Sequence, residues 1–530
     1  MRKFCIWWRK LFEKNKDTIE PNDLIVWISF FILGCCVYFM KISNDLSNPD
    51  SIWNGVYFKK TSGWEISLGR YMIAILQFVR NYIVNSCFIV FASLILLSMS
   101  IIFILKIFDI KTFGWKLVIG ALIIISPTVG STLTYYYCSD LYMLGYFLAV
   151  LSVWFMVGKG GRTGIIFSGI ALMLSAALYQ AYISFAILLC LMYIMKLLID
   201  NKVAKEQIYK SVGTCILGGI LGIALYLSSN KIVQIITGIK ATEDRGFSRM
   251  GMIDTNQIIN QIKNCYITFF EYYFSDSMIN NNYYGRKYIN LLFFIAIVTI
   301  IIIILRKQKL LIYRKIFFVL LLLFIPLGFM SICILAPEVS VLDNTGVLML
   351  PTMNYIYVFA VILFESIGEK NSWFTTVGIT LFVQLILVFL MLLSLELGGQ
   401  VYIKHNMLKT YNVAMQIHNR IEQYGVRNKI CVIGNMEEGN YPELYPDLKN
   451  SQHWVAAGNK TIWPTFEGTQ NCWICFIKQY LGKAYTVCSL EEYYEIINTP
   501  KYSQMGIFPD KNGVSVINDI VVIKLSDTTW

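Results

Sequence analysis

Residues 84–105 read VNSCFIVFASLILLSMSIIFIL, an apolar run of bilayer-spanning length with no charged side chain. The run ends at Lys106, and two further lysines follow before the next apolar run begins at residue 117. The composition of the whole chain agrees, since 56% of its 530 residues are hydrophobic, 15% are charged and the mean hydropathy is +0.57. These values exclude a soluble globular protein and indicate an integral membrane protein.

Ten other runs repeat this pattern along the first three quarters of the chain. The eleven predicted spans are 24–41, 84–105, 117–134, 141–157, 164–179, 181–197, 211–229, 289–305, 315–336, 346–365 and 374–396. Lysine and arginine gather in alternate connecting segments, which the positive-inside rule assigns to the cytoplasm. These basic segments are 2–16, 106–116, 159–162, 196–210 and 306–315. We therefore expect the N-terminus inside and, after an odd number of spans, everything beyond residue 397 outside.

The expected fold is a polytopic α-helical membrane protein with about 11 transmembrane helices and a small C-terminal extracytoplasmic α/β domain. Residues 1–23 would form a cytoplasmic segment, 24–397 the transmembrane domain and 398–530 the extracytoplasmic domain. We expect the first span to be a retained anchor, because the charged segment before it is too long for a cleaved signal peptide. The excess charge behind the net value of +12 lies in short cytoplasmic loops that face anionic lipid, so no nucleic-acid partner is indicated.

The loops are unequal in length. Most connections are short, whereas three segments predicted to lie outside are long, namely 42–83, 230–288 and 398–530. A channel or a simple carrier does not need this asymmetry, but an enzyme that works at the outer leaflet does. A flippase or transporter of lipid-linked glycans should also show internal repeats and charged residues within its spans. The span interiors are almost free of charge, which favours the enzyme.

The sequence contains neither a GxGxxG after a strand nor a P-loop, which argues against a nucleotide substrate. No cofactor is indicated, although a divalent metal stays open. Cys472 and Cys475 form a CxxC without the second pair that a zinc site needs. On an outer face, packing or a disulfide involving Cys431 or Cys488 is the favoured interpretation.

The first outer segment carries residue types suited to the chemistry of lipid-linked sugars. Asp45 follows the first span, and Arg70 precedes an amphipathic stretch, 71–80, that suits the membrane interface. A sugar held on a lipid phosphate requires a carboxylate to deprotonate the acceptor hydroxyl and a guanidinium to hold the phosphate. Asp45 and Arg70 fit these two roles. The alternative is that Asp45 caps a loop and Arg70 reaches toward lipid headgroups.

Several short motifs along the chain resemble one known family. They are Asn44-Asp45, Trp64 to Arg70, Leu178 to Tyr182, Met505 to Asp510, Val514 to Ile517 and Ile520 to Leu525. In this order they resemble the bacterial membrane glucosyltransferases of the GtrII type, which have the polytopic GT-C architecture. The resemblance implies transfer of a glucosyl-type sugar from a polyprenyl phosphate, such as undecaprenyl phosphate glucose, to a cell-surface polysaccharide. It also implies a multi-pass protein of the bacterial cytoplasmic membrane, acting on its outer face beside a lipid-linked-sugar synthase and a flippase.

Two features depart from the family pattern. Asp45 is followed by Leu46 instead of a second acidic residue, which leaves Asp50 as the second carboxylate. The loop from Glu338 to Met349 has no basic residue for the phosphate. Arg245 and Arg249, in the second long outer segment, are therefore further candidates for holding it.

The resemblance also makes Asp140 a second outer acidic residue that would position the acceptor or a metal. Trp64, Tyr179 and Gln180 are the candidates for binding the acceptor. The three tyrosines at 135–137, shortly before Asp140, are as consistent with an interfacial aromatic belt as with a functional site.

The segment 398–530 is expected to be a mixed α/β domain. Its predicted elements are a helix at 406–423, a buried strand at 429–434, a helix opened by a capping box at Ser489, and a terminal hairpin of 514–517 and 520–525.

Two points stay open at this stage. Trp454, Trp463 and Trp473 would stack on sugar faces or, as such residues more often do, fill the small core. A polysaccharide polymerase shares the predicted topology and differs in its acceptor, so it stays an alternative to the transferase.

Overall fold

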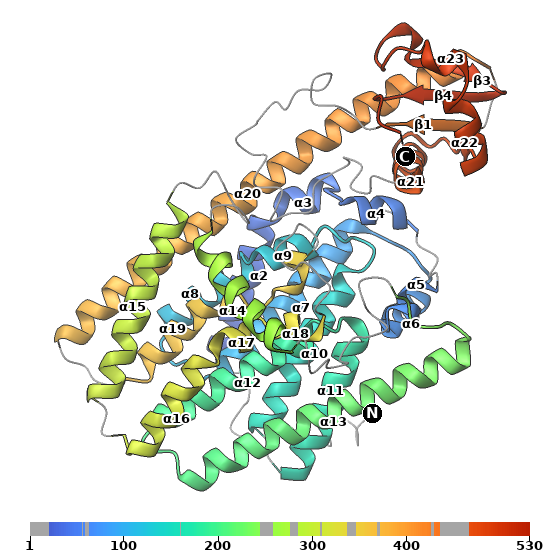
Figure 1. Cartoon of the computed structure of the whole chain (residues 1–530). Helices are drawn as coiled ribbons and strands as arrows, with labels where there is room; N and C mark the ends of the chain where they lie inside the picture. Colours follow the sequence, from blue (N-terminus) through green and yellow to red (C-terminus); the bar gives the residue numbers. More distant parts are fainter. Residues whose placement is uncertain are drawn as a thin grey trace.

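The computed structural model describes residues 21–55, 57–58, 63–158, 161–243, 258–275, 285–307, 310–336, 346–367, 372–425, 429–434 and 466–529 (Figure 1). It is mostly helical, with one small sheet near the C-terminus. Arg245, Arg249, Trp454 and Trp463 lie outside the described residues, as do the basic residues of the N-terminal segment.

Seven of the described helices are long and apolar enough to cross a membrane. They are α7 (Ser86–Ile107), α10 (Ser139–Gly158), α11 (Gly161–Leu178), α12 (Tyr182–Ile199), α13 (Lys205–Thr237), α15 (Arg286–Lys307) and α20 (Ser372–Glu422). An eighth span results if α2 (Pro21–Val37) is joined to α3 (Phe39–Asn44) and α4 (Pro49–Asn54) across a bend of 55°. The chain is thus a polytopic helical membrane protein.

Besides the bent first span, three of the predicted spans are broken into shorter helices. They are α8 (Phe113–Ile124) with α9 (Pro127–Thr132), α16 (Ile312–Leu323) with α17 (Ile325–Phe329) and α18 (Ile332–Leu335), and η2 (Gly346–Met349) with α19 (Tyr355–Glu365). Pro127 and Pro326 explain two of the breaks, because each begins a new helix where its missing N–H costs no hydrogen bond. The count of about 11 transmembrane helices is therefore not confirmed.

Segments predicted to be cytoplasmic meet at one end of the helical bundle. Asp23 forms ion pairs with Lys106 at 3.3 Å and with Lys116 at 3.8 Å. The Arg314 guanidinium donates a hydrogen bond to the carbonyl oxygen of Asp200 at 2.7 Å. Lys196 also donates to the carbonyl oxygen of Phe108. Three of the basic segments, 106–116, 196–210 and 306–315, therefore come together in space.

The first outer segment gathers at the other end of the bundle. Ser51 Oγ donates to the carbonyl oxygen of Thr134 at 2.7 Å, which ties α4 to the turn before α10. The second long outer segment contributes α14 (Ile258–Phe274), which packs against α17 and α18. Beyond α5 (Trp64–Ser67), the amphipathic stretch expected at 71–80 forms α6 (Tyr71–Val79). This helix buries Tyr71, Ile73 and Gln77 and exposes Ile75, Phe78 and Val79.

One buried ion pair ties the first span to the last. Lys41 Nζ lies 2.6 Å from Glu396 Oε1, and the two side chains are 0% and 2% exposed. Lys41 also donates to the carbonyl oxygen of Gly130 on α9 at 2.7 Å, and Gln400 donates to Glu396 at 3.0 Å. A Cβ at Gly130 would lie 1.9 Å from Glu396 Oε2, so this approach requires glycine. Three elements, α3, α9 and α20, therefore meet at the pair.

Helix α20 runs unbroken from the last predicted span to Glu422 and leads into the C-terminal unit, by which we mean the described residues from 429 onward. Its sheet has the order β2-β1-β4-β3, in which β1 is parallel to β2 and β4, and β3 is antiparallel to β4. The strands are β1 (Lys429–Ile433), β2 (Thr486–Val487), β3 (Val514–Ile517) and β4 (Ile520–Lys524). The helices are α21 (Phe466–Phe476), the π-helix η4 (Ile477–Leu481), α22 (Leu490–Ile497), α23 (Pro500–Ser503) and η5 (Lys511–Gly513).

The elements predicted for this unit are confirmed. The helix at 406–423 is the end of α20, the buried strand is β1, and the hairpin is β3 with β4. Ser489 opens α22 with the expected capping box, in which its Oγ accepts from the Glu492 backbone N–H and its own N–H donates to the Glu492 carboxylate. Trp473 is 4% exposed and belongs to the core, so it is not available for stacking on a sugar.

Of the two roles predicted for Cys431 and Cys488, packing or a disulfide, the structure shows packing, since every described cysteine is a free thiol. Cys431 and Cys488 are 0% and 3% exposed and lie in one apolar cluster, with the Cys488 N–H donating to the carbonyl oxygen of neighbouring Ile430 at 3.0 Å. They therefore serve as small apolar packing residues.

The Lys41–Glu396 pair yields a stability prediction. Lys41→Met should lower the stability by about 3–5 kcal/mol, because it leaves a buried carboxylate without its partner. The double variant Lys41→Met/Glu396→Met should recover most of that loss. Thermal unfolding of the purified protein in one detergent measures both effects. Lys429→Met is the control, because its surface ion pair with Glu492 should contribute no more than about 1 kcal/mol. Equal loss in the single and double variants would contradict the assignment.

Candidate active site

Asp45 lies at the point where the first span ends and the chain turns. It terminates α3 in the left-handed conformation with φ of 48°, which an aspartate tolerates better than most residues. Ser86, at the start of α7, donates a hydrogen bond from its hydroxyl to Asp45 Oδ1. The carboxylate is half-buried, so it lies at the surface of the bundle with one oxygen held in place.

The segment that follows Asp45 is fastened to the tyrosine-rich turn at 133–138. Asn48 caps α4 by accepting from the Ser51 backbone N–H at 2.7 Å, and Ser51 Oγ accepts from the Tyr136 backbone N–H at 3.1 Å. Burial and then the negative charge of Asp50 raise the pKa of Tyr135, which therefore stays protonated and bonds to the Asp50 carboxylate. Both carboxylates of the first outer segment are thus held by hydroxyl groups.

Arg70 is placed by a tight turn. The Arg70 N–H donates to the carbonyl oxygen of Glu65 at 2.8 Å and the Gly69 N–H donates to that of Ile66 at 2.9 Å, the two bonds of a Schellman motif that ends α5. The motif needs a left-handed residue, and Gly69 supplies it with φ of 70°. Arg70 then opens α6 as its N-cap.

Two buried side chains hold this turn by hydrogen bonds to its backbone carbonyl oxygens. Gln180 Nε2 donates to the carbonyl oxygen of Leu68 at 2.6 Å and to the Tyr226 hydroxyl at 2.8 Å. The Tyr226 hydroxyl in turn donates to the carbonyl oxygen of Gly69 at 3.2 Å. Residues from α13 and from the link between α11 and α12 therefore fix the backbone just before Arg70.

The Arg70 guanidinium lies among aromatic rings. Its Nη1 donates to the Tyr142 hydroxyl at 3.3 Å, and its Cζ lies 4.7 Å from the centre of the Tyr179 ring, a cation–π contact. Its Nε is buried and has no hydrogen-bond partner. No carboxylate among the described residues pairs with Arg70, so its side-chain contacts in this part of the chain are with tyrosines.

Arg80, at the C-terminal end of α6, provides a contrast. Its guanidinium forms an ion pair with Asp140 at 2.7 Å and also donates to the carbonyl oxygen of Tyr137 at 2.6 Å. The Asp140 carboxylate is therefore neutralised by a nearby cation. Of the two arginines, Arg70 is the one able to accept an anionic ligand.

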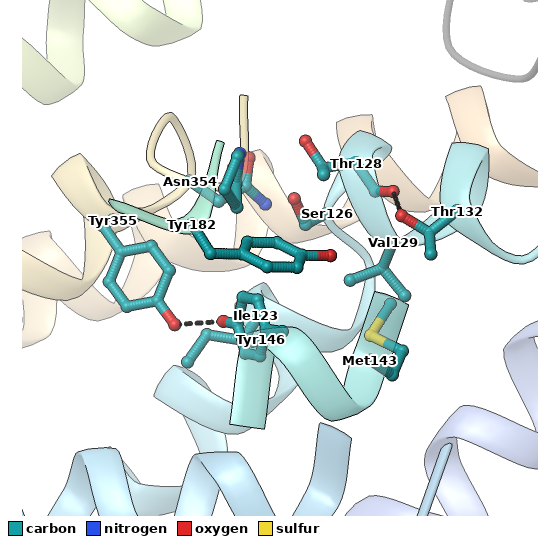
Figure 2. Close-up of a pocket in the computed structure, with 11 residues that line it drawn as sticks. Ile123, Ser126, Thr128, Val129, Thr132, Met143, Tyr146, Tyr182, Asn354 and Tyr355 are labelled. Carbon is teal, nitrogen blue, oxygen red and sulfur yellow. Dashed lines mark hydrogen bonds between the residues drawn. The ribbon is translucent and has the colours of Figure 1, made fainter. Parts of the chain in front are cut away.

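A chain of tyrosine rings leads from Arg70 into the bundle. The Tyr179 and Tyr182 ring centres are 5.4 Å apart, and those of Tyr182 and Tyr146 are 5.9 Å apart. Tyr182 and Tyr146 line a small pocket between α9, α10, α12 and α19, where the Tyr146 and Tyr355 hydroxyls are hydrogen-bonded (Figure 2). The pocket walls are mostly apolar, and Ile123, Val129 and Met143 are among them (Figure 2).

The remaining predicted site residues differ in how far their side chains are exposed. Trp64 is 49% exposed at the start of α5, whereas Tyr179 and Gln180 are 2% and 4% exposed. The buried pair supports Arg70, so the geometry does not support the predicted acceptor contacts of these two. Among the described residues, no group of three or more His, Cys, Asp and Glu side chains is placed to hold a metal ion.

Sequence reasoning missed several partners of these residues. Ser86, Tyr142 and Tyr226 contact Asp45, Arg70 and the Arg70 turn across long sequence separations, and no local pattern marks them. Arg80 was visible as a charge at the end of the amphipathic stretch, but its pairing with Asp140 was not.

Comparison with known proteins supplies the family. A search of curated proteins and a search of solved structures found no match to the chain. The model of the family described as glucosyl transferase GtrII matches residues 39–364, more than half of the chain, and this confirms the resemblance. The match includes Asp45, Arg70 and Asp140 and ends before the C-terminal unit. The chain therefore belongs to the glucosyl transferase GtrII family.

Proposed function

We propose that this membrane glycosyltransferase moves a glucosyl-type sugar from a polyprenyl phosphate to a cell-surface polysaccharide on the outer face of the bacterial cytoplasmic membrane. The observation that carries the proposal is the Arg70 guanidinium, which is enclosed by tyrosines and has no carboxylate partner among the described residues. Holding a half-buried guanidinium among aromatic rings without a carboxylate is costly, and a phosphate from a ligand would complete its contacts. Family membership supports the transferase over a flippase or transporter.

The donor chemistry follows from the position of Arg70. It opens α6, whose exposed face is apolar and therefore suits the membrane interface. A phosphate on a polyprenyl chain would reach that depth while its hydrocarbon tail stays in lipid. Such a donor has to be made and delivered to the outer leaflet, which implies a lipid-linked-sugar synthase and a flippase as functional partners.

Asp45 is the residue we assign as general base. In the proposed step, the acceptor hydroxyl oxygen bonds to the anomeric carbon, the bond from that carbon to the phosphate oxygen breaks, and the electron pair leaves with the polyprenyl phosphate at Arg70. The hydroxyl proton passes to Asp45. The Ser86 hydroxyl occupies Oδ1, which aims the other carboxylate oxygen at the acceptor.

The two other acidic candidates are less suited to be the base, because Asp140 is paired with a cation and the hydroxyl partner of Asp50 is a buried tyrosine, unlike the partly exposed Ser86 that bonds to Asp45. Asp50 accepts a hydrogen bond from Tyr135, and Asp140 is paired with Arg80. We therefore assign Asp50 to holding the tyrosine-rich turn and Asp140 to holding α6 against α10.

The orientation yields a topology prediction. We propose that the N-terminus is inside and the C-terminal unit outside, because the basic loops share one end and α20 carries the unit to the end where Asp45 lies. Protease added to intact spheroplasts should remove a tag placed after Trp530 and spare a tag placed before Met1. Both tags should disappear after lysis, which is the control for protease action. Full protection of the C-terminal tag in intact spheroplasts would overturn the orientation.

Arg70→Lys should weaken donor binding about tenfold or more, because lysine keeps the charge but loses the two-pronged geometry that matches a phosphate. The measurement is the KM for polyprenyl-phosphate glucose with the purified enzyme in nanodiscs. Arg80→Lys is the matched control and should leave this KM unchanged, since lysine can still pair with Asp140. An unchanged donor KM in Arg70→Lys would move the phosphate-binding role to Arg245 or Arg249.

Asp45→Asn should lower kcat by about 100-fold or more, because the amide keeps the size of the side chain but cannot accept the proton. The donor KM should stay the same, which separates loss of the base from loss of the fold. Asp50→Asn should cost much less, since asparagine can still accept the bond from Tyr135. A kcat close to wild type in Asp45→Asn would refute the assignment and make Asp50 and then Asp140 the next residues to test.

A further inference from the structure

The C-terminal unit lies against the segment that carries the two acidic candidates. Helix α21 packs on α4, and Ile52 of α4 is part of the same apolar core as Trp473 and Phe476 (Figure 1). The Gln479 side chain donates to the carbonyl oxygen of Ile52. The family match ends at residue 364, so this contact joins the matched region to a part of the chain beyond it.

The contact is made by an unusual turn. Helix α21 passes directly into the π-helix Ile477–Leu481, which ends at Gly482 with φ of 69°. Such π-helical turns are rare in proteins as a whole, but those that occur are often found at functional sites. This one carries Tyr480, whose ring lies against Phe476 with 4.6 Å between ring centres. The Tyr480 hydroxyl lies 3.2 Å from Ser47 Oγ, two residues after Asp45.

A second tyrosine, in the first outer segment, lies near the residue that holds Asp45. The carbonyl oxygen of Tyr57 accepts from the Val84 N–H at 2.9 Å, which places Tyr57 beside the start of α7, where Ser86 holds Asp45. The Tyr57 side chain is 57% exposed. The pKa of Tyr57 is raised by burial and then by the Asp45 charge. The pKa of Tyr480 is raised mainly by burial, lowered by its hydrogen bond with Ser47 and raised by the Asp45 charge, which agrees with the position of Tyr480 beside Ser47.

We propose that Tyr57 and Tyr480 form the acceptor site, on which a sugar ring of the polysaccharide stacks with one hydroxyl directed at Asp45. The inference rests on the proposed transferase function and adds a site to which the C-terminal unit contributes. Aromatic rings beside a carboxylate match a glycan, which presents apolar C–H faces and hydroxyl edges together. The partly exposed Tyr57 and the half-buried Tyr480 leave this face open to a polymer arriving from water.

The test uses the full-length protein in nanodiscs, polyprenyl-phosphate glucose as donor, and polysaccharide extracted from cells that lack this gene as acceptor. Tyr480→Ala and Tyr57→Ala should each raise the KM for the polysaccharide about tenfold and leave the donor KM unchanged. Tyr480→Phe should stay within about threefold of wild type, because it keeps the ring and loses only the bond to Ser47. Tyr494→Ala is the matched control, since this tyrosine of α22 is 46% exposed and should leave both values unchanged.

Equilibrium binding of the same polysaccharide, measured without donor, separates this inference from the proposed function. Weaker binding in Tyr480→Ala and Tyr57→Ala supports the acceptor site even if the wild-type protein transfers no sugar, a result that would overturn the transferase alone. The acceptor site alone would be overturned if the wild-type protein transfers sugar and both alanine variants keep the wild-type acceptor KM and the wild-type affinity for the polysaccharide. A rise in donor KM equal to the rise in acceptor KM would also overturn it, because it would show a general disturbance of the fold.

Discussion

The ion pair between Lys41 and Glu396 is the contact on which the arrangement of this protein depends. Its partners are 355 positions apart, and both are almost completely buried in the interior of the bundle. Separating two such charges from water is costly unless they meet each other and further hydrogen-bond partners, which Gly130 and Gln400 provide here. The pair therefore admits one alignment of α3, α9 and α20. Asp45 follows Lys41 by a single helical turn, and α20 leads to the C-terminal unit. The same alignment therefore positions both Asp45 and the unit that carries Tyr480, which lie on the two sides of the proposed acceptor site.

The two arginines of the first outer segment, Arg70 and Arg80, have different partners. Arg80 has a carboxylate partner and closes α6 onto α10. Arg70 has tyrosine neighbours instead, and a Schellman turn, Gln180 and Tyr226 hold its backbone. A rigid backbone with a guanidinium that has no carboxylate partner among the described residues would need little reorganisation to bind an anion. In our proposal, the charge of Arg80 is neutralised within the protein and that of Arg70 is neutralised by a substrate.

Much of the fold could be predicted from the sequence, because its signals are local. Apolar runs located the helices, the basic loops indicated which segments share an end, and the capping box at Ser489 marked the start of α22. The breaks at Pro127 and Pro326 were also local signals, but hydropathy alone passes over them, so runs predicted as single spans are divided in the structure. The continuous α20 was divided in the prediction, because its character changes from apolar to amphipathic without any interruption of the helix.

The candidate site was predictable only in part. Asp45 and Arg70 were visible from residue type and predicted depth, but the groups that define their chemistry come from α7, α10 and α13. Tyr179 and Gln180 lie in one of the motifs that carry the family resemblance and were named as candidates for binding the acceptor. Their burial below Arg70 depends on how α11 and α12 pack, which no local pattern encodes.

The central claim is that Arg70 holds the phosphate of a polyprenyl donor. An experimental structure of the full-length protein in nanodiscs with bound polyprenyl monophosphate tests this most directly. The account predicts phosphate oxygens within about 3 Å of the Arg70 guanidinium nitrogens, with the Arg80–Asp140 ion pair intact and the prenyl chain leaving along α6. A phosphate bound away from Arg70, with its guanidinium still enclosed by Tyr142 and Tyr179 alone, would contradict it.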